Sequence, residues 1–113
     1  MLYAESSTSI SANDFELRAG GVAGLGPGLY IASPNANQLP FGDGFLCLAS
    51  PIMRLVPVDG PDIGIPTPID LQGGLPSLGT VAAGSSLFFQ LWYRDVTPAG
   101  FNLTDSLRVV FAP

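Results

Sequence analysis

Glycine and proline interrupt this chain so often that they exclude long helices. The sequence has 14 Gly and 11 Pro among 113 residues, together more than a fifth of the chain. Proline removes a backbone N–H and clashes with the preceding helical turn, and glycine loses more backbone entropy in a helix than any other residue. Between these residues, apolar side chains never recur at i, i+3, i+4, i+7 over a helical length. The sequence therefore predicts a fold without long helices.

Short runs with strand character lie between the turn residues. Phe15–Ala19 alternates apolar and polar residues, as a half-buried strand does. Phe45–Leu48 is a continuous apolar run, which indicates a strand buried on both faces. Pro57 places the end of Ile52–Val58 at a sheet edge or a bulge. The other expected strands are Leu2–Ile10, Gly28–Ala32, Thr67–Gln72, Leu87–Arg94 and Leu107–Ala112, with one helical turn at Asn102–Asp105 and mostly turns over Gly73–Gly84.

About eight short strands with turns every eight to twelve residues are typical of an all-β fold. We predict a single antiparallel β-sandwich or jelly-roll domain over residues 1–113, a length that supports one hydrophobic core. Residues 1–10 are expected to form an extended, exchangeable N-terminal strand.

The charge balance excludes two classes of partner. Hydrophobic residues make up 47 % of the chain and charged residues 12 %, with nine acids, four arginines, no Lys and no His, for a formal charge of −5. Nucleic acids and anionic membrane surfaces are both bound by basic faces, so neither is expected as a partner. No apolar run reaches the 18 residues that membrane insertion requires. Because the chain is so apolar, part of its surface is expected to meet another chain, a membrane-like surface or a neighbouring domain.

The missing residue types exclude most chemistry. Without His there is no Ser-His-Asp or Cys-His catalysis, and without Lys there is no Schiff-base chemistry. Cys47 is the one cysteine, so neither a disulfide nor the usual zinc sites are expected, and we interpret it as a small buried hydrophobe. Paired carboxylates at Asp14/Glu16 or Asp59/Asp62 leave a glycosidase as the remote alternative. We therefore predict that the chain is not an enzyme and needs no cofactor.

Calcium is the one metal that the sequence leaves open. Asp43, Asp59 and Asp62 carry hard oxygen ligands in loops. No EF-hand spacing is present, and Asp before Gly is also what a tight turn prefers. We keep these three residues as weak calcium candidates.

Aromatic residues gather in the last quarter of the chain, Ser86–Pro113. Trp92 and Tyr93 are neighbours on one expected strand, so they point to opposite faces, one into the core and one outward. Arg94 and Asp95 are expected to form a buried or turn-closing ion pair. Phe101 and Leu103 are expected to anchor the turn between the strands Leu87–Arg94 and Leu107–Ala112. Leu107, Val109 and Phe111 share one face of the last strand.

Three motifs carry a family resemblance: Pro40-Phe-Gly-Asp-Gly-Phe-Leu-Cys47, Phe89-Gln-Leu-Trp-Tyr-Arg-Asp95 and Gly100-Phe-Asn-Leu-Thr-Asp105. Together they resemble an uncharacterised C-terminal β-domain of large secreted or surface proteins from planctomycete-like environmental bacteria. The resemblance implies an extracellular, non-enzymatic accessory module and supplies no catalytic residues. The chain departs from the pattern at Val96, where proline is usual, and near its end, where many members have a second cysteine.

These observations favour an extracellular or cell-surface structural or adhesive module that self-assembles into a filament or surface layer. Its expected partners are copies of itself or neighbouring domains. The N-terminal segment, with Leu2 and Tyr3, would add to a neighbour's sheet, and the last strand would accept it. Sheet edges without Lys are poorly guarded against such pairing. The alternative is a carbohydrate-binding module, calcium-assisted, with exposed Tyr30, Trp92 or Tyr93 against the glycan.

Overall fold

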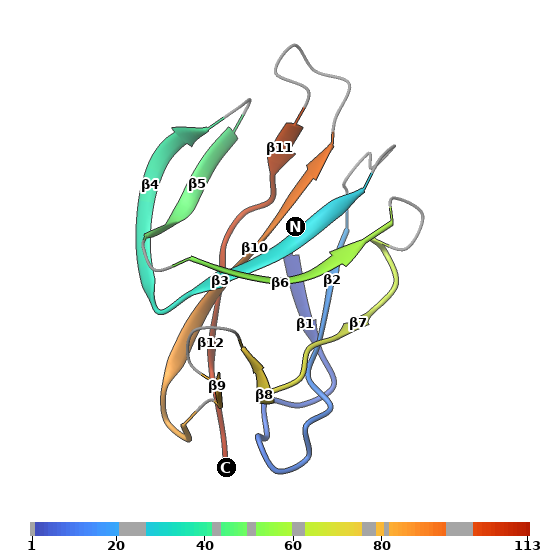
Figure 1. Ribbon diagram of the computed structural model, residues 1–113, viewed down its shortest axis with the longest axis vertical. Coiled ribbons are helices and arrows are strands. Elements are labelled where there is room, and N and C mark those ends of the chain that lie inside the picture. The colour runs from blue at the N-terminus through green and yellow to red at the C-terminus, as the bar shows by residue number, and fades with distance from the viewer. Residues whose placement is uncertain are drawn as a thin grey trace.

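A computed structural model describes residues 2–20, 27–41, 44–49, 52–59, 63–75, 79–80, 82–94 and 101–113. The described chain is all-β, which confirms the predicted fold class (Figure 1). It contains twelve strands in these ranges rather than about eight, because strands also form over Asn35–Phe41, Gly79–Thr80, Phe101–Leu103 and most of Gln72–Leu75, outside the predicted strands. All strand pairings between them are antiparallel.

The strands form two larger sheets and two hairpins. The main sheet has the order β11 (Phe101–Leu103), β10 (Ser86–Arg94), β3 (Gly28–Ser33), β6 (Met53–Val58), and β12 (Leu107–Val110) also pairs with β10. The small sheet has the order β1 (Leu2–Glu5), β2 (Glu16–Ala19), β7 (Thr67–Pro68). The hairpins are β4 (Asn35–Phe41) with β5 (Gly44–Ala49), and β8 (Gln72–Leu75) with β9 (Gly79–Thr80).

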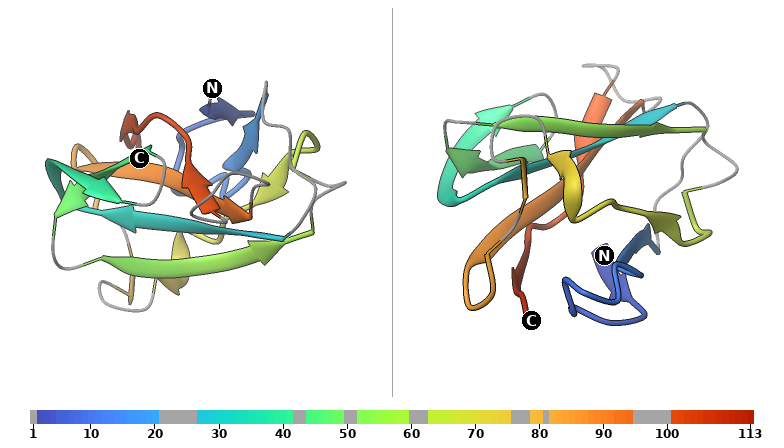
Figure 2. Two further views of the ribbon diagram at one scale, coloured as in Figure 1. Left: turned by 90° about the horizontal axis from the view of Figure 1, so that it is seen from above. Right: turned by 60° about the horizontal axis from the view of Figure 1, so that its bottom comes forward.

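The principal core lies between the main sheet and the small sheet, which covers one face of it (Figure 2). Three phenylalanines meet at its centre. The ring of Phe15 lies 5.4 Å from those of Phe89 and Phe111, and the last two are 6.2 Å apart. All three are buried, and each such ring pair adds about 1 kcal/mol beyond the burial of its area. This aromatic cluster joins β10 to segments near both chain ends.

A second, smaller core lies on the opposite face of the main sheet. Ile31 of β3, Leu48 of β5 and Leu103 of β11 are its buried members. It forms because β3 and β10 carry apolar residues on both faces, so the β4–β5 hairpin has a surface to pack against. We call this second face, which points away from the small sheet, the outer face.

Several predictions about individual segments are corrected. The expected helical turn at Asn102–Asp105 is wrong, since Phe101–Leu103 is strand β11 paired with β10. Phe45–Leu48 is not buried on both faces, because the Phe45 side chain is 51 % exposed while Leu48 is buried. Cys47 is half-buried rather than buried. The Gly73–Gly84 region contains hairpin β8–β9. By contrast, Pro57 does lie on an edge strand, since β6 ends the main sheet.

The N-terminal segment pairs with its own chain. β1 pairs with β2, and Leu2, 2 % exposed, donates its N–H to the Asp105 carboxylate at 3.0 Å. Farther along, the Ile10 N–H donates to the Ala112 carbonyl at 2.9 Å, and the Ala112 N–H donates to Thr8 at 3.0 Å. Exchange of this segment with a neighbour would first have to break these bonds.

Candidate functional site

The outer face of the main sheet is organised by one buried amide, Gln90 of β10. Its Nε2 donates to the Phe45 carbonyl at 2.8 Å and to the Thr104 carbonyl at 2.7 Å, while its Oε1 accepts the Cys47 N–H at 3.0 Å. Ser33 adds a bond from its hydroxyl to the Ala49 carbonyl. These contacts hold β5 over one part of the outer face.

Trp92 occupies the part of this face next to the hairpin. Residues alternate along β10, so Phe88, Gln90, Trp92 and Arg94 share the outer side. The Trp92 ring packs edge-on against Phe101, with 5.8 Å between centroids. Two surface hollows meet at Trp92. One, of about 440 Å³, is lined by Pro27, Gly28, Leu29, Trp92, Tyr93, Arg94 and Phe101. The other, of about 270 Å³, is lined by Ile31, Leu46, Ile52, Arg54, Trp92 and Leu103.

Each hollow has one arginine at its wall. Arg94 lines the larger hollow and Arg54 the smaller one, and both side chains are exposed. Arg54 lies opposite Ile31 in the β3–β6 ladder, which places it on the outer side. Within the described part of the chain, no carboxylate lines either hollow and neither guanidinium has an acidic partner.

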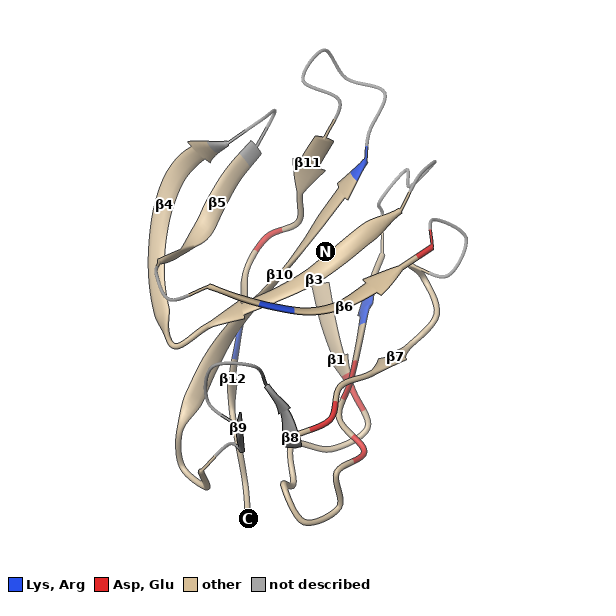
Figure 3. Ribbon diagram, viewed as in Figure 1, with Lys and Arg blue, Asp and Glu red and all other residues tan. Residues whose placement is uncertain are grey.

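Most of the described acidic side chains lie elsewhere. In Figure 3 acidic segments lie around the small sheet and the loops beside it, after β11 and at the end of β6, whereas basic segments mark β2, β6, β12 and the end of β10. Glu5 pairs with Arg18, whose guanidinium also stacks 4.5 Å from the centroid of the Tyr3 ring. Asp14 accepts the Ser7 hydroxyl at 2.6 Å. These contacts give the small sheet's acids structural partners, whereas the described charged residues at the two hollows are arginines.

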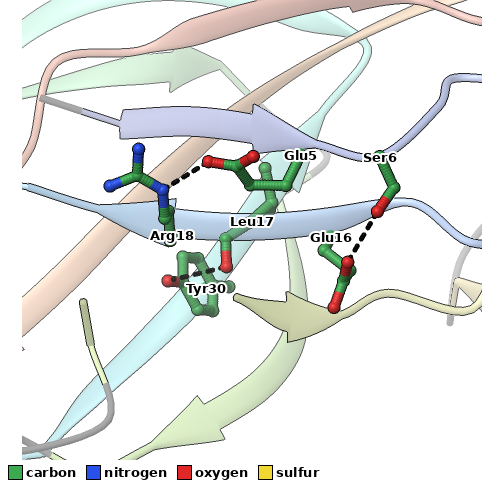
Figure 4. Close-up of polar contacts among 6 residues, drawn as sticks. All are labelled: Glu5, Ser6, Glu16, Leu17, Arg18 and Tyr30. Atoms are coloured by element: carbon green, nitrogen blue, oxygen red, sulfur yellow. Dashed lines mark hydrogen bonds and ion pairs between the residues drawn. The ribbon is translucent and has the colours of Figure 1, made fainter. Parts of the chain in front are cut away.

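Figure 4 shows how polar contacts tie the small sheet together and to the core. Ser6 donates its hydroxyl to Glu16 at 2.7 Å, beside the Arg18–Glu5 pair. The Tyr30 hydroxyl of the main sheet donates to the Leu17 carbonyl of β2 at 3.4 Å. Burial raises the pKa of Tyr30 above its ordinary value of 10.0, and a hydrogen bond with the Thr67 side chain opposes that rise. Tyr30 is fully buried, so the prediction that it is an exposed ligand contact is wrong.

The predicted site residues fall into three groups. Leu2, Val109 and Phe111 are buried in the principal core, where their role is structural. Trp92, Tyr93, Phe101 and Leu107 are partly exposed, and Tyr3 and Arg94 are exposed. Asp43, Asp62 and Asp95 lie outside the described residues.

The expectation for the Trp92–Tyr93 pair holds only in part. The two side chains do point to opposite faces, since Tyr93 packs on the principal core and Trp92 on the second core. Both are half-buried, however, so the expectation of one core side chain and one exposed side chain is not met. Arg94 is exposed, so the buried form of the predicted Arg94–Asp95 pair is wrong, while the turn-closing form depends on Asp95, which lies outside the described residues.

The candidate calcium ligand that the structure describes is Asp59. It is exposed and borders a shallow hollow of about 320 Å³, together with Pro57, Val58, Ile65, Pro66 and Thr67. No other described acid lines that hollow. Among the residues that the structure describes, no group of three or more His, Cys, Asp or Glu side chains is placed to hold a metal ion.

Sequence reasoning missed Arg54, Gln90 and strand β4. The signal for Arg54 was present, because it follows Met53 in a strand and so faces the opposite side. Nothing local in the sequence marks Gln90 as buried, since its three partners come from distant segments.

Comparison with known protein families, with curated proteins and with solved structures finds no match. The family resemblance drawn from the sequence motifs therefore stays a prediction. Across the described residues there is no helix of the length and apolar character needed to cross a membrane.

Proposed function

We propose that this chain is a non-enzymatic structural or adhesive module of the cell exterior that associates with copies of itself by strand addition. The observation that supports this most is the edge of β4. β4 is hydrogen-bonded to β5 on one side only, and residues 35–40 are all exposed. An edge of this kind offers backbone groups to another chain, although the N–H groups of Asn35 and Gln38 already donate to the Ser33 hydroxyl at 3.1 Å and to the Asn37 amide oxygen at 2.8 Å.

β4 has no charged residue, a property that it shares with its partner β5, with the β8–β9 hairpin and with the short edge strands β7 and β11, but not with β1, β6 and β12. The β1 edge carries Glu5, the β6 edge carries Arg54 together with Pro57, and β12 carries Arg108. Charges and prolines at these positions oppose edge-to-edge pairing. Among the described edge strands, β4 is the longest and consists only of uncharged residues, Asn35-Ala-Asn-Gln-Leu-Pro-Phe41.

The same hairpin exposes two large apolar side chains, Leu39 at 50 % and Phe45 at 51 %. Covering them would add hydrophobic stabilisation to the backbone bonds of an added strand. Pro40 and the register shift between Ala36 and Leu39 shorten the pairing edge, however. We therefore infer weak, concentration-dependent association rather than an obligate dimer.

The non-enzymatic part of the proposal rests on residue types and their partners. The chain has no His and no Lys. The described acids of the small sheet, Glu5 and Glu16, are bonded to Arg18 and Ser6 respectively rather than facing a cleft. The location outside the cell comes from the motif resemblance alone.

Sedimentation velocity across a concentration series tests the association. We expect the wild-type chain to shift to larger species as its concentration rises, and Gln38→Lys to stay monomeric because a lysine guards the edge. Ala83→Lys is the matched control, since it adds the same charge at an exposed position outside β4. A wild-type chain that remains monomeric at the highest concentration would contradict the proposal. If the two lysine variants associate to the same extent, the β4 edge is not the surface through which the chains associate.

A second candidate function is carbohydrate binding, which the two hollows around Trp92 favour. An aromatic ring at the junction of two open hollows can stack on the apolar face of a sugar. Calcium assistance, with Asp59 or the other loop acids, belongs to this alternative. A glycan array with and without chelator tests it. Absence of binding in both conditions rejects carbohydrate binding, and unchanged binding with chelator rejects a role for calcium in it.

A further inference from the structure

We propose that the outer face around Trp92 binds a carboxylated polysaccharide, with Arg54 and Arg94 contacting carboxylates on either side of the Trp92 ring. This inference rests on the carbohydrate-binding function and adds to it the charge class of the ligand and the residues that select it. Three observations carry it: the two hollows, their two arginines, and the paired backbone beneath them.

The hollows define where a chain-like ligand would lie. They share Trp92 as a lining residue, so the two hollows adjoin at that ring and mark out a path from Arg54 of β6 to Arg94 at the end of β10. Their walls are largely apolar, with Ile31 and Leu103 in one and Leu29 and Phe101 in the other. A path of this kind suits a ligand with apolar faces and polar edges, as sugar rings have.

The arginines supply the charge complementarity. Arg54 and Arg94 are exposed and have no acidic partner among the described residues, whereas Arg18 is engaged by Glu5 and the Tyr3 ring. The planar guanidinium matches a carboxylate with two parallel hydrogen bonds. Arg54 lies two strands across and four residues along the ladder from Arg94, a Cα separation of roughly 16 Å at ordinary strand spacings. A ligand that meets both arginines must therefore repeat its negative charge along an extended chain.

The backbone beneath Trp92 favours a glycan over an acidic peptide. At Trp92, β10 is paired on both sides, to Leu29 of β3 and to Leu103 of β11. An extended peptide gains most of its affinity by adding a strand to an open edge. No open edge exists at this point of the outer face, so recognition there depends on ring faces and ionic contacts.

Trp92 also provides the readout, because it is the one tryptophan of the chain. The experiment titrates tetragalacturonate into the full chain and follows Trp92 emission, with calorimetry as a second signal. The fully methyl-esterified tetramer serves as the uncharged probe. We expect the acid to change the emission in a saturable way and the ester to have little effect.

Three arginine variants locate the contacts. Arg54→Gln and Arg94→Gln should each weaken binding about tenfold, the scale of one lost charge-assisted hydrogen bond. Arg108→Gln is the matched control, since Arg108 is exposed opposite Phe88 but lines neither hollow, and it should change binding less than about twofold. All three arginines are exposed, so the variants should fold normally.

Each contrary outcome overturns a different part of the inference. Equal binding of acid and ester would overturn the selection for carboxylates and leave carbohydrate binding in place. If neither tetramer changes the emission or releases heat, both the selection for carboxylates and carbohydrate binding at this face are overturned. Equal losses in all three arginine variants would show a diffuse charge effect and remove Arg54 and Arg94 from the site.

Discussion

Gln90 shows how a single buried side chain can position a whole surface. It is fully buried on the outer face, and its three hydrogen bonds reach the backbone of Phe45, Cys47 and Thr104. A buried amide is favourable only when its donors and acceptors are satisfied, and here both ends of the amide have partners. Gln90 therefore links the β4–β5 hairpin and the β11 end to the central strand.

The first prediction at this scale concerns Gln90→Leu. The substitution leaves two carbonyls and one N–H without their partner, so we expect unfolding free energy to fall by about 2–4 kcal/mol. Urea denaturation measures the change. Gln38→Leu, at an exposed position, is the control and should change stability by less than about 0.5 kcal/mol. A similarly small loss in Gln90→Leu would show that the amide bonds do not hold the hairpin.

The second residue-scale prediction concerns pH and Tyr30. Burial raises the pKa of Tyr30 in the folded chain, while in the unfolded chain it stays near 10.0. Below pH 10 both states keep the proton, so Tyr30 adds no pH dependence. Above that pH the unfolded state releases the proton first, so the free energy of unfolding falls as pH rises toward the folded pKa.

Denaturation from pH 8 to 11 in wild type and Tyr30→Phe measures this effect. We expect the fall above pH 10 to be smaller in the variant, which should also lose about 1 kcal/mol at neutral pH with the bond to Leu17. Tyr3→Phe is the comparison, since Tyr3 is 37 % exposed. The same alkaline slope in wild type and Tyr30→Phe would mean that Tyr30 is not the group responsible.

At the scale of elements, β10 organises the molecule. It pairs with β3 along one side, and with β12 and then β11 along the other. Its alternating residues build both cores: Leu87, Phe89 and Leu91 face the small sheet, while Phe88 and Trp92 face outward. The β4–β5 hairpin attaches to this outer side through the second core.

The third prediction tests that attachment. Leu48 is 1 % exposed and is the hairpin's buried member of the second core. Leu48→Ala should lower the unfolding free energy by about 2–4 kcal/mol, the cost of a large-to-small change in a packed interior. Hydrogen exchange should show the largest loss of protection in β4 and β5. Loss spread evenly over the small sheet would mean that the hairpin is not a separate packing unit.

Strands with a strong local pattern could be predicted from the sequence. Phe15–Ala19 and Leu87–Arg94 have clear alternation or aromatic content, and both are strands, β2 and β10, within a residue or so at each end. β4 could not be predicted, because Asn35, Asn37 and Pro40 are typical turn residues. β4 forms a strand because it pairs with β5, and local residue propensities carry no information about that pairing.

The candidate site was less predictable than the fold. Trp92 was identified because tryptophan is rare in this chain, and alternation showed only that Trp92 and Tyr93 point to opposite faces. Whether Tyr30 or Trp92 is exposed depends on which face the small sheet covers, and only the tertiary structure decides that. For the same reason, it could not be predicted from the sequence that Arg54 and Arg94 lie on the same face of the main sheet.

At the scale of the whole molecule, compactness and charge are the relevant properties. The Cα radius of gyration is 13.4 Å, the value expected for a compact domain of this length. The formal charge of −5 opposes the approach of a second copy, and salt screens that repulsion. Salt also screens the ionic contacts proposed at Arg54 and Arg94.

The fourth prediction uses this contrast. Raising salt from 0.15 M to 1 M should strengthen self-association of the chain and weaken its binding of tetragalacturonate, because the first is opposed by charge and the second is driven by it. Sedimentation and Trp92 emission on the same protein sample measure the two effects. Changes of the same sign would mean that one of the two surfaces has been assigned the wrong chemistry.

Amide hydrogen exchange of β4, compared between dilute and concentrated protein, tests the proposed strand addition most directly. An added strand hydrogen-bonds the outward-facing N–H groups of β4, so their exchange should slow at high concentration in the wild-type chain and not in Gln38→Lys. Amides at the edges of β1 and β6 should exchange equally at both concentrations. Unchanged exchange in β4 under conditions where the chain is demonstrably associated would contradict the account.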